Sequence, residues 1–390
     1  MPIINRIAEF HDEMTAWRRR IHANPETAFQ EHKTSAFVAE QLKSFGIEVH
    51  RGLAQTGVVG TLKGAHGDGP AIGLRADMDA LHIEEKNQTA WRSQVPGKMH
   101  ACGHDGHTTM LLGAAKYLAE TRNFAGTVHF IFQPAEEHEG GGRAMVEEGL
   151  FDKFPMESVY GMHNFPGIEV GRFMVREGPC MAAADSIDIV VRGKGVHAAA
   201  PHLGTDPIVT AAQIVTALQT VASRTINPLD AVVLTITQIH AGETYNIIPE
   251  EVVLRGTVRS FKPEVQTAAE AAIKRICAGV ASSMGVTVEA SYTRGYPATV
   301  NDKDEAAFAA GVAAQVTGQN NVTFNSDPVM GAEDFAYMLN EKPGCYIGIG
   351  NGPGEGGCWL HNPHYDFNDA ILPLGASYWA RLAEARLAKR

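Results

Sequence analysis

The 390-residue chain has few cysteines and no long apolar run, and these two shortages exclude several classes of protein. No uninterrupted apolar stretch approaches the roughly 20 residues that a membrane-spanning helix needs. The five cysteines are odd in number and widely spaced, which is typical of reduced thiols and not of a disulfide framework. The N-terminal sequence MPIINR lacks the apolar core of a signal peptide. We therefore expect a cytoplasmic protein that does not enter the membrane.

An excess of basic charge is also missing. The chain has 33 Lys and Arg against 44 Asp and Glu, a formal net charge of −11, so it carries no electrostatic footprint for nucleic acid. A Gly-x-Ser-x-Gly elbow in a strand-to-helix context, as in many serine hydrolases, is not found. What the chain does have is 44% hydrophobic residues, which at this length is enough for a large core and for two domains.

The densest group of chemically active side chains lies at residues 100–107, with the sequence HACGHDGH. Zinc and similar metals bind imidazole and thiolate together, so Cys102 and His104 are candidate ligands. An apolar helical pattern follows over residues 108–120, and the N-terminus of that helix would favour a thiolate at Cys102. The alternative is a polar loop whose histidines face water.

Three further clusters supply ligand types that this stretch lacks. Glu136 and Glu137 follow an apolar strand at 127–133. Neighbours on an extended chain point in opposite directions, so one carboxylate can bind a metal while the other acts on the substrate. His163 ends a strand at 158–162, and His361 lies late in the chain. A lone Glu-Glu pair is usually a solvated turn and a lone histidine is usually structural, but ligands so widely scattered fit a site assembled by a fold.

Strands and helices alternate through the first and last parts of the chain. This alternation predicts an α/β domain with a mostly parallel sheet covered on both faces, in which ligand sites form beyond the carboxyl ends of the strands. The pairs Asp77/Asp79 and Glu136/Glu137, and also His163, each follow a predicted strand, which favours one common site. Strands are predicted at 56–63, 71–76, 127–133, 158–162 and 345–349, and helices at 5–45 (broken near Pro25), 108–120, 143–150, 303–316, 332–340 and 370–388.

The middle of the chain follows a different order. Strands are predicted at 186–193, 231–240, 250–260 and 286–291, with helices at 206–223 and 264–283. This β-α-β-β-α-β order is that of a ferredoxin-like α+β sandwich. We therefore expect a domain of residues 185–292 inserted into a catalytic domain made of residues 1–184 and 293–390.

Eight motifs follow one another along the chain: RRRIHANPE (18–26), RADMDAL (75–81), HACGHDGH (100–107), QPAEE (133–137), GMHN (161–164), GKGVHAAAPH (193–202), YNIIP (245–249) and GAEDF (331–335). Through these motifs the whole chain resembles a family of zinc-dependent amidohydrolases and metallopeptidases that includes hippurate hydrolase, indole-acetyl-amino-acid hydrolases, aminoacylase-like carboxypeptidases and N-acetyl-diaminopimelate deacetylase. So many motifs in one order are specific for the family but much less so for the substrate.

This resemblance implies a site with two divalent ions per chain, zinc or else manganese, cobalt or nickel. Glu136 would be the general base, and Asp79 would orient a ligand histidine. Related di-zinc peptidases have His-x-Asp where this chain has Asp77-Met78-Asp79, and a bridging aspartate where it has Cys102, so one histidine ligand is lost. The implied ligands are Cys102, His104, Glu137, His163 and His361.

The implied reaction is hydrolysis of the amide bond of an N-acyl amino acid, hippurate-like or N-acetyl, to a carboxylic acid and a free amino acid. The alternatives within the family are a metallo-carboxypeptidase or dipeptidase, and N-acetyl-diaminopimelate deacetylase. In relatives a histidine of the small domain, here His197, supports the oxyanion and can reach the partner subunit of a homodimer formed through that domain. His202 and Asn246 are substrate-binding candidates, and Arg259 would hold the substrate carboxylate. A solvated turn for His197 and a structural salt bridge for Arg259 are the alternatives.

Two other classes of protein stay open. A non-catalytic metal-binding or scaffold protein would lack the general base or one of the five implied ligands, and all six residues are present. A thiol hydrolase with Cys102 as its nucleophile fits the composition. Chelation distinguishes a metallohydrolase from a thiol hydrolase, because removing the metal abolishes the activity of the first and leaves the activity of the second unchanged.

Overall fold

The computed structural model describes residues 3–137, 139–353 and 358–389, and the chain divides into two compact units. The first unit comprises the chain up to Cys180 together with Val300–Asp327 and the segment from Asp334 onward. The second comprises Met181–Thr299 and Pro328–Glu333. No helix among the described residues combines the length and the apolar character that a membrane crossing requires.

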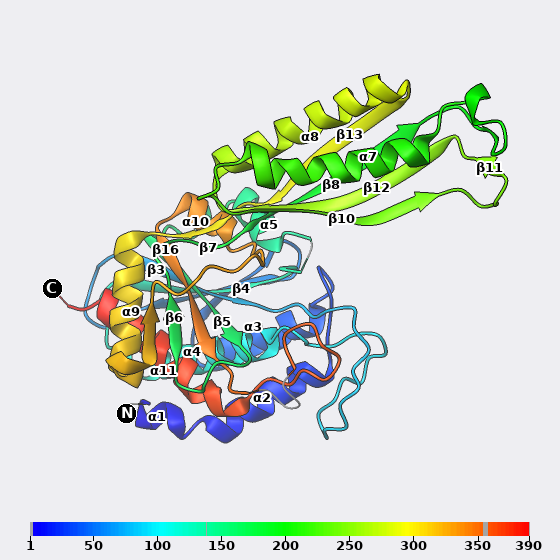
Figure 1. Ribbon diagram of the computed structural model, residues 1–390. Helices are drawn as coiled ribbons and strands as arrows, with labels where there is room; N and C mark the ends of the chain where they lie inside the picture. The colour runs from blue at the N-terminus through cyan, green and yellow to red at the C-terminus, as the bar shows by residue number, and fades with distance from the viewer. Residues whose placement is uncertain (1–2, 138, 354–357, 390) are drawn as a thin grey trace. The chain divides into compact units, whose positions relative to one another are not determined.

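The first unit is built on an eight-stranded sheet with the order β1-β2-β4-β3-β5-β16-β6-β15 (Figure 1). The central strands β4, β3, β5 and β16 are parallel, as are β6 and β15, whereas β1, β2 and the β16–β6 pair are antiparallel. The sheet is therefore mixed and mostly parallel, which confirms the predicted fold class. The strands are β1 (Glu48–Leu53), β2 (Gly57–Lys63), β3 (Ala71–Asp77), β4 (Thr127–Gln133), β5 (Ser158–Phe165), β6 (Phe173–Val175), β15 (Val322–Phe324) and β16 (Gly344–Gly350).

Neighbouring side chains of each strand point to opposite faces of the sheet, and helices pack on these faces. Phe130 and Phe132 of β4 join the main core with α2, α3, α4, α9 and α11, whereas Ile131 between them lies outside that core. Away from this core, α5 and α10 pack against each other, and α5 contacts β4 (Figure 1). The helices are α1 (Asn5–Ala8), α2 (His11–Ala23), α3 (His32–Ser44), α4 (His104–Thr121), α5 (Gly141–Glu147), α6 (Leu150–Lys153), α9 (Lys303–Thr317), α10 (Ala336–Glu341) and α11 (Leu372–Arg386).

The second unit has a four-stranded antiparallel sheet with the order β10-β12-β8-β13. Its helices α7 and α8 pack on each other and on the sheet, around a core that includes Ile189, Leu254 and Ile273. The β-α-β-β-α-β order predicted from the sequence is confirmed. The main elements are β8 (Ala183–Arg192), α7 (Pro207–Thr220), β10 (Val232–Ala241), β12 (Glu251–Ser260), α8 (Pro263–Met284) and β13 (Thr287–Tyr296), with β9 (Val196–His197) paired to β11 (Ile247–Ile248).

Some boundaries differ from the predictions for identifiable reasons. Strand β1 was not predicted, because it is a largely exposed edge strand without apolar alternation. The helix predicted at 332–340 begins only at Ala336, since the Asp334 side chain before it is fixed by Arg75, Gln133 and the backbone of Gly142. The helix predicted at 143–150 is two helices, α5 and α6, separated near Gly149, whose φ is +88°.

A buried ionic network ties α2 to the first turn of α4. Arg18 is fully buried and lies 3.7 Å from Asp105 of α4. His22 contacts the same carboxylate through Nδ1, at 2.8 Å, and Glu85 through Nε2, at 3.3 Å. Burial alone would lower the pKa of His22, but the hydrogen bonds with Asp105 and Glu85 outweigh it and raise that pKa to about 9. His22 is therefore a buried cation at neutral pH.

This network makes the stability of the fold depend on pH. A raised pKa in the folded state means that the stabilisation from His22 is complete below its unfolded pKa, about 6.5, and is lost as the pH rises through about 9. We expect the unfolding free energy of wild type to fall by on the order of 2 kcal/mol across this range relative to His22→Asn. Unfolding midpoints measured between pH 6 and 9.5 check this. His32→Asn, which removes an exposed histidine, should follow wild type, and parallel profiles for all three proteins would contradict the assignment.

Candidate metal centre

The site begins where three parallel strands end. Strands β4, β3 and β5 are neighbours in the sheet, so their carboxyl ends lie at the same edge. Asp77 is the last residue of β3, Gln133 is the last of β4, and His163 lies near the end of β5. The segments that follow these strands carry Asp79 and the Glu136–Glu137 pair, so the predicted convergence of these groups is observed.

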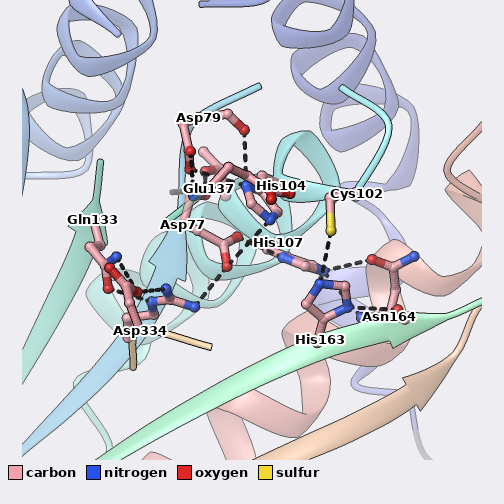
Figure 2. Close-up of polar contacts among 12 residues, drawn as sticks. Asp77, Asp79, Cys102, His104, His107, Gln133, Glu137, His163, Asn164 and Asp334 are labelled. Carbon is pink, nitrogen blue, oxygen red and sulfur yellow. Dashed lines mark hydrogen bonds and ion pairs between the residues drawn. The ribbon is translucent and has the colours of Figure 1, made fainter. Parts of the chain in front are cut away.

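Donor atoms from six predicted site residues gather at this edge. Figure 2 labels four of them, Cys102, His104, Glu137 and His163. In each of three groups the donor atoms lie within 4.8 Å of one another. Cys102 belongs to two of the groups, and its Sγ is 3.3 Å from Nε2 of His163. Nε2 of His361 lies 3.1 Å from a carboxylate oxygen of Glu137. The groups are Cys102/His104/His163, Cys102/Glu137/His361 and His104/Glu136/Glu137.

A glycine between Cys102 and His104 allows both side chains to reach the centre. Gly103 precedes α4 with a φ of +100°, and a Cβ at this position would lie 2.1 Å from Oδ1 of Asn164. Any other residue would therefore be strained and would clash. The late segment is joined to the same loop, because the backbone N–H of His361 donates to the carbonyl of Ala101 at 2.8 Å. These contacts bring residues far apart in the sequence to one point.

Asp79 orients one histidine and one carboxylate of the cluster. Nδ1 of His104 lies 2.9 Å from the Asp79 carbonyl and 3.2 Å from its carboxylate, so Nδ1 carries the proton and donates it (Figure 2). The other Asp79 oxygen accepts the backbone N–H of Glu137 at 2.9 Å. In the neutral imidazole that a metal would bind, Nε2 of His104 is then the acceptor, and it is buried without a hydrogen-bond partner in the described part of the chain. An orphaned buried lone pair of this kind fits a metal ligand.

His163 is prepared in the same manner. Its Nδ1 donates to the backbone carbonyl of Asn164 at 2.7 Å, which leaves the Nε2 lone pair facing the sulfur of Cys102. Burial and the neighbouring histidine His107 lower the pKa of His163 well below its usual value. A neutral imidazole with one free nitrogen is the form that binds metals.

The electrostatic field around these donors is negative. Burial and the carboxylates of Glu137 and Glu136 raise the pKa of Cys102 well above its usual value. The expectation that the helix N-terminus favours a thiolate is therefore wrong for the chain alone, because burial and nearby charge outweigh the dipole. Burial also opposes protonation of His104, yet the carboxylates of Asp77 and Asp79 raise its pKa to about 10. A divalent cation would neutralise the carboxylate charge that raises the pKa values of Cys102 and His104, so the donor set fits a metal.

Asp77 lies beside these donors and forms a further group with His104 and His107, whose donor atoms are within 4.8 Å of one another. Its carboxylate lies 2.7 Å from Arg75 and 2.7 Å from Nδ1 of His107. Nε2 of His107 in turn lies 2.7 Å from Asn164 (Figure 2). Arg75 also contacts Gln133 and Asp334. Sequence reasoning noticed the motifs that carry these residues but gave Arg75, Gln133, Asn164 and Asp334 no role, because only the fold brings them together.

The Glu136–Glu137 pair lies in a turn and not on an extended chain as predicted. Ala135 before it has a φ of +53°, so the chain reverses direction after Pro134. Oxygens of the two carboxylates lie within 4.8 Å of each other in the group with His104, but of the two only Glu137 is also grouped with Cys102 and His361. The two side chains are therefore available for different tasks.

The other predicted residues belong to the second unit. His197, on β9, pairs with Ile247 of β11, and the neighbouring Ala198 donates to the carbonyl of Asn246 at 2.9 Å. His202 lies in the adjoining 3₁₀ turn Pro201–Leu203, and the side chains of all three candidates are exposed. Nδ1 of His197 accepts the N–H of Ala199 at 3.1 Å, so its Nε2 carries a proton that can be donated.

Arg259 is half-buried near the opposite end of β12 from these residues. Arg259 is eight positions after Glu251, where β12 begins shortly after β11, and eight positions correspond to about 26 Å of extended chain. The structure therefore does not bring Arg259 together with His197 and Asn246 within one chain. The described residues offer its guanidinium no hydrogen bond or ion pair, and Asp185 is the charge that acts on its pKa, which burial lowers. Among the residues that the structure describes, the salt bridge considered for Arg259 is therefore not formed.

Comparison with known proteins agrees with this geometry. Residues 73–385 match Peptidase family M20/M25/M40. The chain is 41% identical over 383 residues to hippurate hydrolase of Campylobacter jejuni, covering 98% of this chain and 99% of that one. It is 38% identical over 377 residues to N-acetylcysteine deacetylase of Bacillus subtilis, covering 96% and 97%.

A solved structure shows the same fold at a similar level of identity. The B. subtilis protein YXEP, a dinuclear metal binding peptidase from the M20 family, aligns with a TM-score of 0.86 and 34% identity, covering 98% of this chain and all of that one. The family match, the full-length relatives and this shared fold lead to one conclusion: the chain belongs to peptidase family M20/M25/M40 and is a hydrolase of that family.

Proposed function

We propose that this M20 hydrolase cleaves the amide bond of N-acyl amino acids, hippurate-like or N-acetyl, to a carboxylic acid and a free amino acid. The observation that carries the proposal is the pair of three-donor groups that share Cys102, with Glu136 beside them. The names of two full-length relatives support the substrate class, since hippurate and N-acetylcysteine are both N-acyl amino acids.

The two groups that share Cys102 would each hold one divalent ion, zinc or else manganese, cobalt or nickel. The name of the YXEP protein, a dinuclear metal binding peptidase, supports two ions. When bound, the ions would polarise the amide carbonyl and lower the pKa of water toward about 7. The thiol of Cys102 would lose its proton on binding, because the cation offsets the carboxylates that raise its pKa.

Glu136 would move the protons of the reaction. Its side chain is 7% exposed and lies beside the donors without belonging to either group that shares Cys102. As general base it accepts a proton from the attacking water, and it then delivers this proton to the leaving amine nitrogen. Asp79 would hold the His104 ring and the backbone of Glu137 in place during these steps through its hydrogen bonds to both.

His197 would donate a hydrogen bond to the oxyanion of the tetrahedral intermediate. The Ala199 N–H holds its Nδ1 as an acceptor, so the Nε2–H is available as a donor. Asn246 and His202 lie on the adjoining segments and would contact the substrate. Arg259, half-buried and without an ion-pair partner among the described residues, would hold the substrate carboxylate.

The separation of His197 and Arg259 supports a homodimer. A distance of about 26 Å along β12 is too long for one small N-acyl amino acid to contact both residues of a single chain. If both act on one substrate, they come from two subunits. We propose that residues 185–292 form a lid and dimerisation domain. Its edge strand β10 carries the exposed apolar side chain of Ile239, which supports an interface there.

The function predicts metal-dependent hydrolysis of N-acyl amino acids. We expect hippurate or an N-acetyl amino acid to be cleaved by metal-loaded protein, activity to be lost on chelation, and a divalent ion to restore it. Release of the free amino acid from a substrate panel, measured together with metal content, checks this. Full activity in exhaustively metal-free protein would contradict the proposal and favour Cys102 as a nucleophile.

The same panel tests recognition of the carboxylate. Each free acid is paired with its carboxamide, which keeps the scissile bond and removes the charge. We expect kcat/KM to fall by about 10²-fold for the carboxamide in wild type and by much less in Arg259→Met, which has already lost the fork. Equal kcat/KM for acid and carboxamide in wild type would exclude this mode of binding.

Glu136 and its neighbour provide a matched pair of variants. Glu136→Gln keeps size and removes the proton acceptor, so we expect kcat to fall by about 10²–10⁴-fold with metal content retained. Glu137→Gln should lose metal instead, because Glu137 belongs to a group that shares Cys102. Kinetics and metal analysis on both variants decide between the roles. Metal loss in Glu136→Gln alone would show that the two roles are exchanged.

Subunit mixing tests whether His197 acts in trans. Inactive His197→Ala and Glu136→Gln proteins are combined at equal amounts and allowed to exchange. A mixed dimer then has one complete site, so random exchange should restore about a quarter of wild-type activity. Mixing Glu136→Gln with Glu137→Gln is the control, since both defects lie in the same unit and no site is completed. Verified exchange without recovered activity would mean that His197 does not act across the interface.

A further inference from the structure

The turn that presents Glu136 has an unfavourable backbone conformation. Ala135 has a φ of +53° and is fully buried, and side chains with a Cβ rarely adopt this region. Its carbonyl accepts the N–H of Gly141 at 2.9 Å, so the residue links the end of β4 to the start of α5. If Ala135 returned to a negative φ, the side chain of Glu136 would point in another direction. A hydrogen bond to the Ala135 N–H would oppose this change.

That partner is the carboxylate of Glu31, at the start of α3. Glu31 is fully buried, and its Oε1 accepts the backbone N–H of Ala135 at 3.0 Å and that of Phe29 at 3.1 Å. Phe29 also has a positive φ, +57°. The other oxygen, Oε2, accepts the hydroxyl of Thr56 at 2.6 Å. One carboxylate oxygen thus fixes two residues in strained conformations.

The turn is held on both sides of Glu136. Glu31 binds the N–H of the residue before it, and Asp79 binds the N–H of the residue after it, Glu137, at 2.9 Å. The Pro134–Ala135 peptide unit and the Glu136–Glu137 peptide unit, on either side of the Ala135–Glu136 segment, are therefore both anchored by buried carboxylates. Asp79 also contacts His104, whereas Glu31 accepts from two backbone N–H groups and from the Thr56 hydroxyl, none of which belongs to a predicted metal ligand.

We propose that Glu31 is a positioning residue for the reaction: it holds the Ala135 N–H so that the Glu136 carboxylate faces the attacking water. This inference rests on the proposed role of Glu136 as the general base. Glu31 touches neither substrate nor the reacting atoms, and it acts through the backbone of the turn. A misplacement of about 1 Å at a catalytic group can lower the rate by about 10²-fold, so an anchor that prevents this movement has a large effect on the rate.

The role requires an acceptor and not a charge. Burial raises the pKa of Glu31 to about 7, while the hydrogen bond from Thr56 acts in the opposite direction. In either protonation state Oε1 keeps its lone pairs for Ala135 and Phe29, since the proton of the neutral acid can be donated from Oε2 to the Thr56 oxygen. A glutamine at this position would keep the same pattern through its amide oxygen and its NH₂ group.

The first experiment compares three variants in the metal-loaded enzyme. Glu31→Gln should keep kcat within about threefold of wild type, and Glu31→Leu, which has no acceptor, should lose about 10²-fold in kcat with KM and metal content unchanged. Thr56→Val is the matched control, because it disturbs the same buried carboxylate but leaves the bonds to Ala135 and Phe29. Its kcat should stay within about threefold of wild type.

A double variant separates positioning from a loss of folded protein. Glycine adopts positive φ without cost, so Ala135→Gly should let the turn regain its shape without Glu31. We expect Glu31→Leu/Ala135→Gly to recover kcat by about threefold or more over Glu31→Leu, while Ala135→Gly alone does not raise the kcat of wild type. The melting temperature of each variant is measured alongside, and assays are made well below the lowest one.

Three results would overturn the inference: a wild-type kcat in Glu31→Leu, a loss of kcat that only follows the loss of folded protein, or no gain from Ala135→Gly. Glu136→Gln is included so that the two proposals can fail separately. If Glu136→Gln keeps wild-type kcat, the proposed base is wrong whatever the Glu31 variants do. If Glu136→Gln is inactive and Glu31→Leu is fully active, only the positioning role is wrong.

Discussion

The geometry of the candidate metal centre depends on hydrogen bonds that buried carboxylates accept from loops at one edge of a sheet. Asp79 is the central example, because one side chain joins the loop after β3 to both His104 and the backbone of Glu137. Hydrogen bonds to charged groups are worth roughly 1.5–3 kcal/mol each, and a buried charge left without them is costly. The metal-binding donors are thus held in place by carboxylates such as Asp79, which does not belong to either of the two groups that share Cys102.

This concentration of acids has an electrostatic cost that the protein offsets only in part. Arg75 is buried among Asp77, Asp334 and Gln133 and neutralises some of the charge. The remaining negative field is visible in the raised pKa values of Cys102 and His104. A cation bound by these side chains would relieve the repulsion, so metal binding and folding stability of the first unit are expected to be coupled.

The sequence predicted those features whose signal is local. The apolar runs of β3, β4 and β5 and the polar residues after them are contiguous, so both the strands and the convergence of His104, Glu137 and His163 could be inferred. The edge strand β1 could not, because most of its residues are exposed, and β6 and β15 could not, because three residues are too few for a pattern. Backbone strain was also invisible: nothing in QPAEE reveals that Ala135 has a positive φ, or that a carboxylate more than 100 residues earlier holds its N–H. The prediction of a thiolate at Cys102 in the chain alone was wrong for a related reason. The dipole of α4 can be inferred from the sequence, whereas the carboxylates that raise the pKa of the thiol are brought near it only by the fold.

The position of β16 in the sheet has a consequence for how the protein is made. β16 lies between β5 and β6 and is their shared neighbour, yet it is translated only after the whole second unit. At about 5–20 residues per second, the residues between Phe165 and Gly344 take roughly 10–35 s to emerge from the ribosome. During that time the buried strand β5 has an unpaired edge, and His361 has not yet been made. The nascent first unit therefore waits with an open, apolar sheet edge, which makes this interval the stage of synthesis at which aggregation and chaperone binding should be greatest.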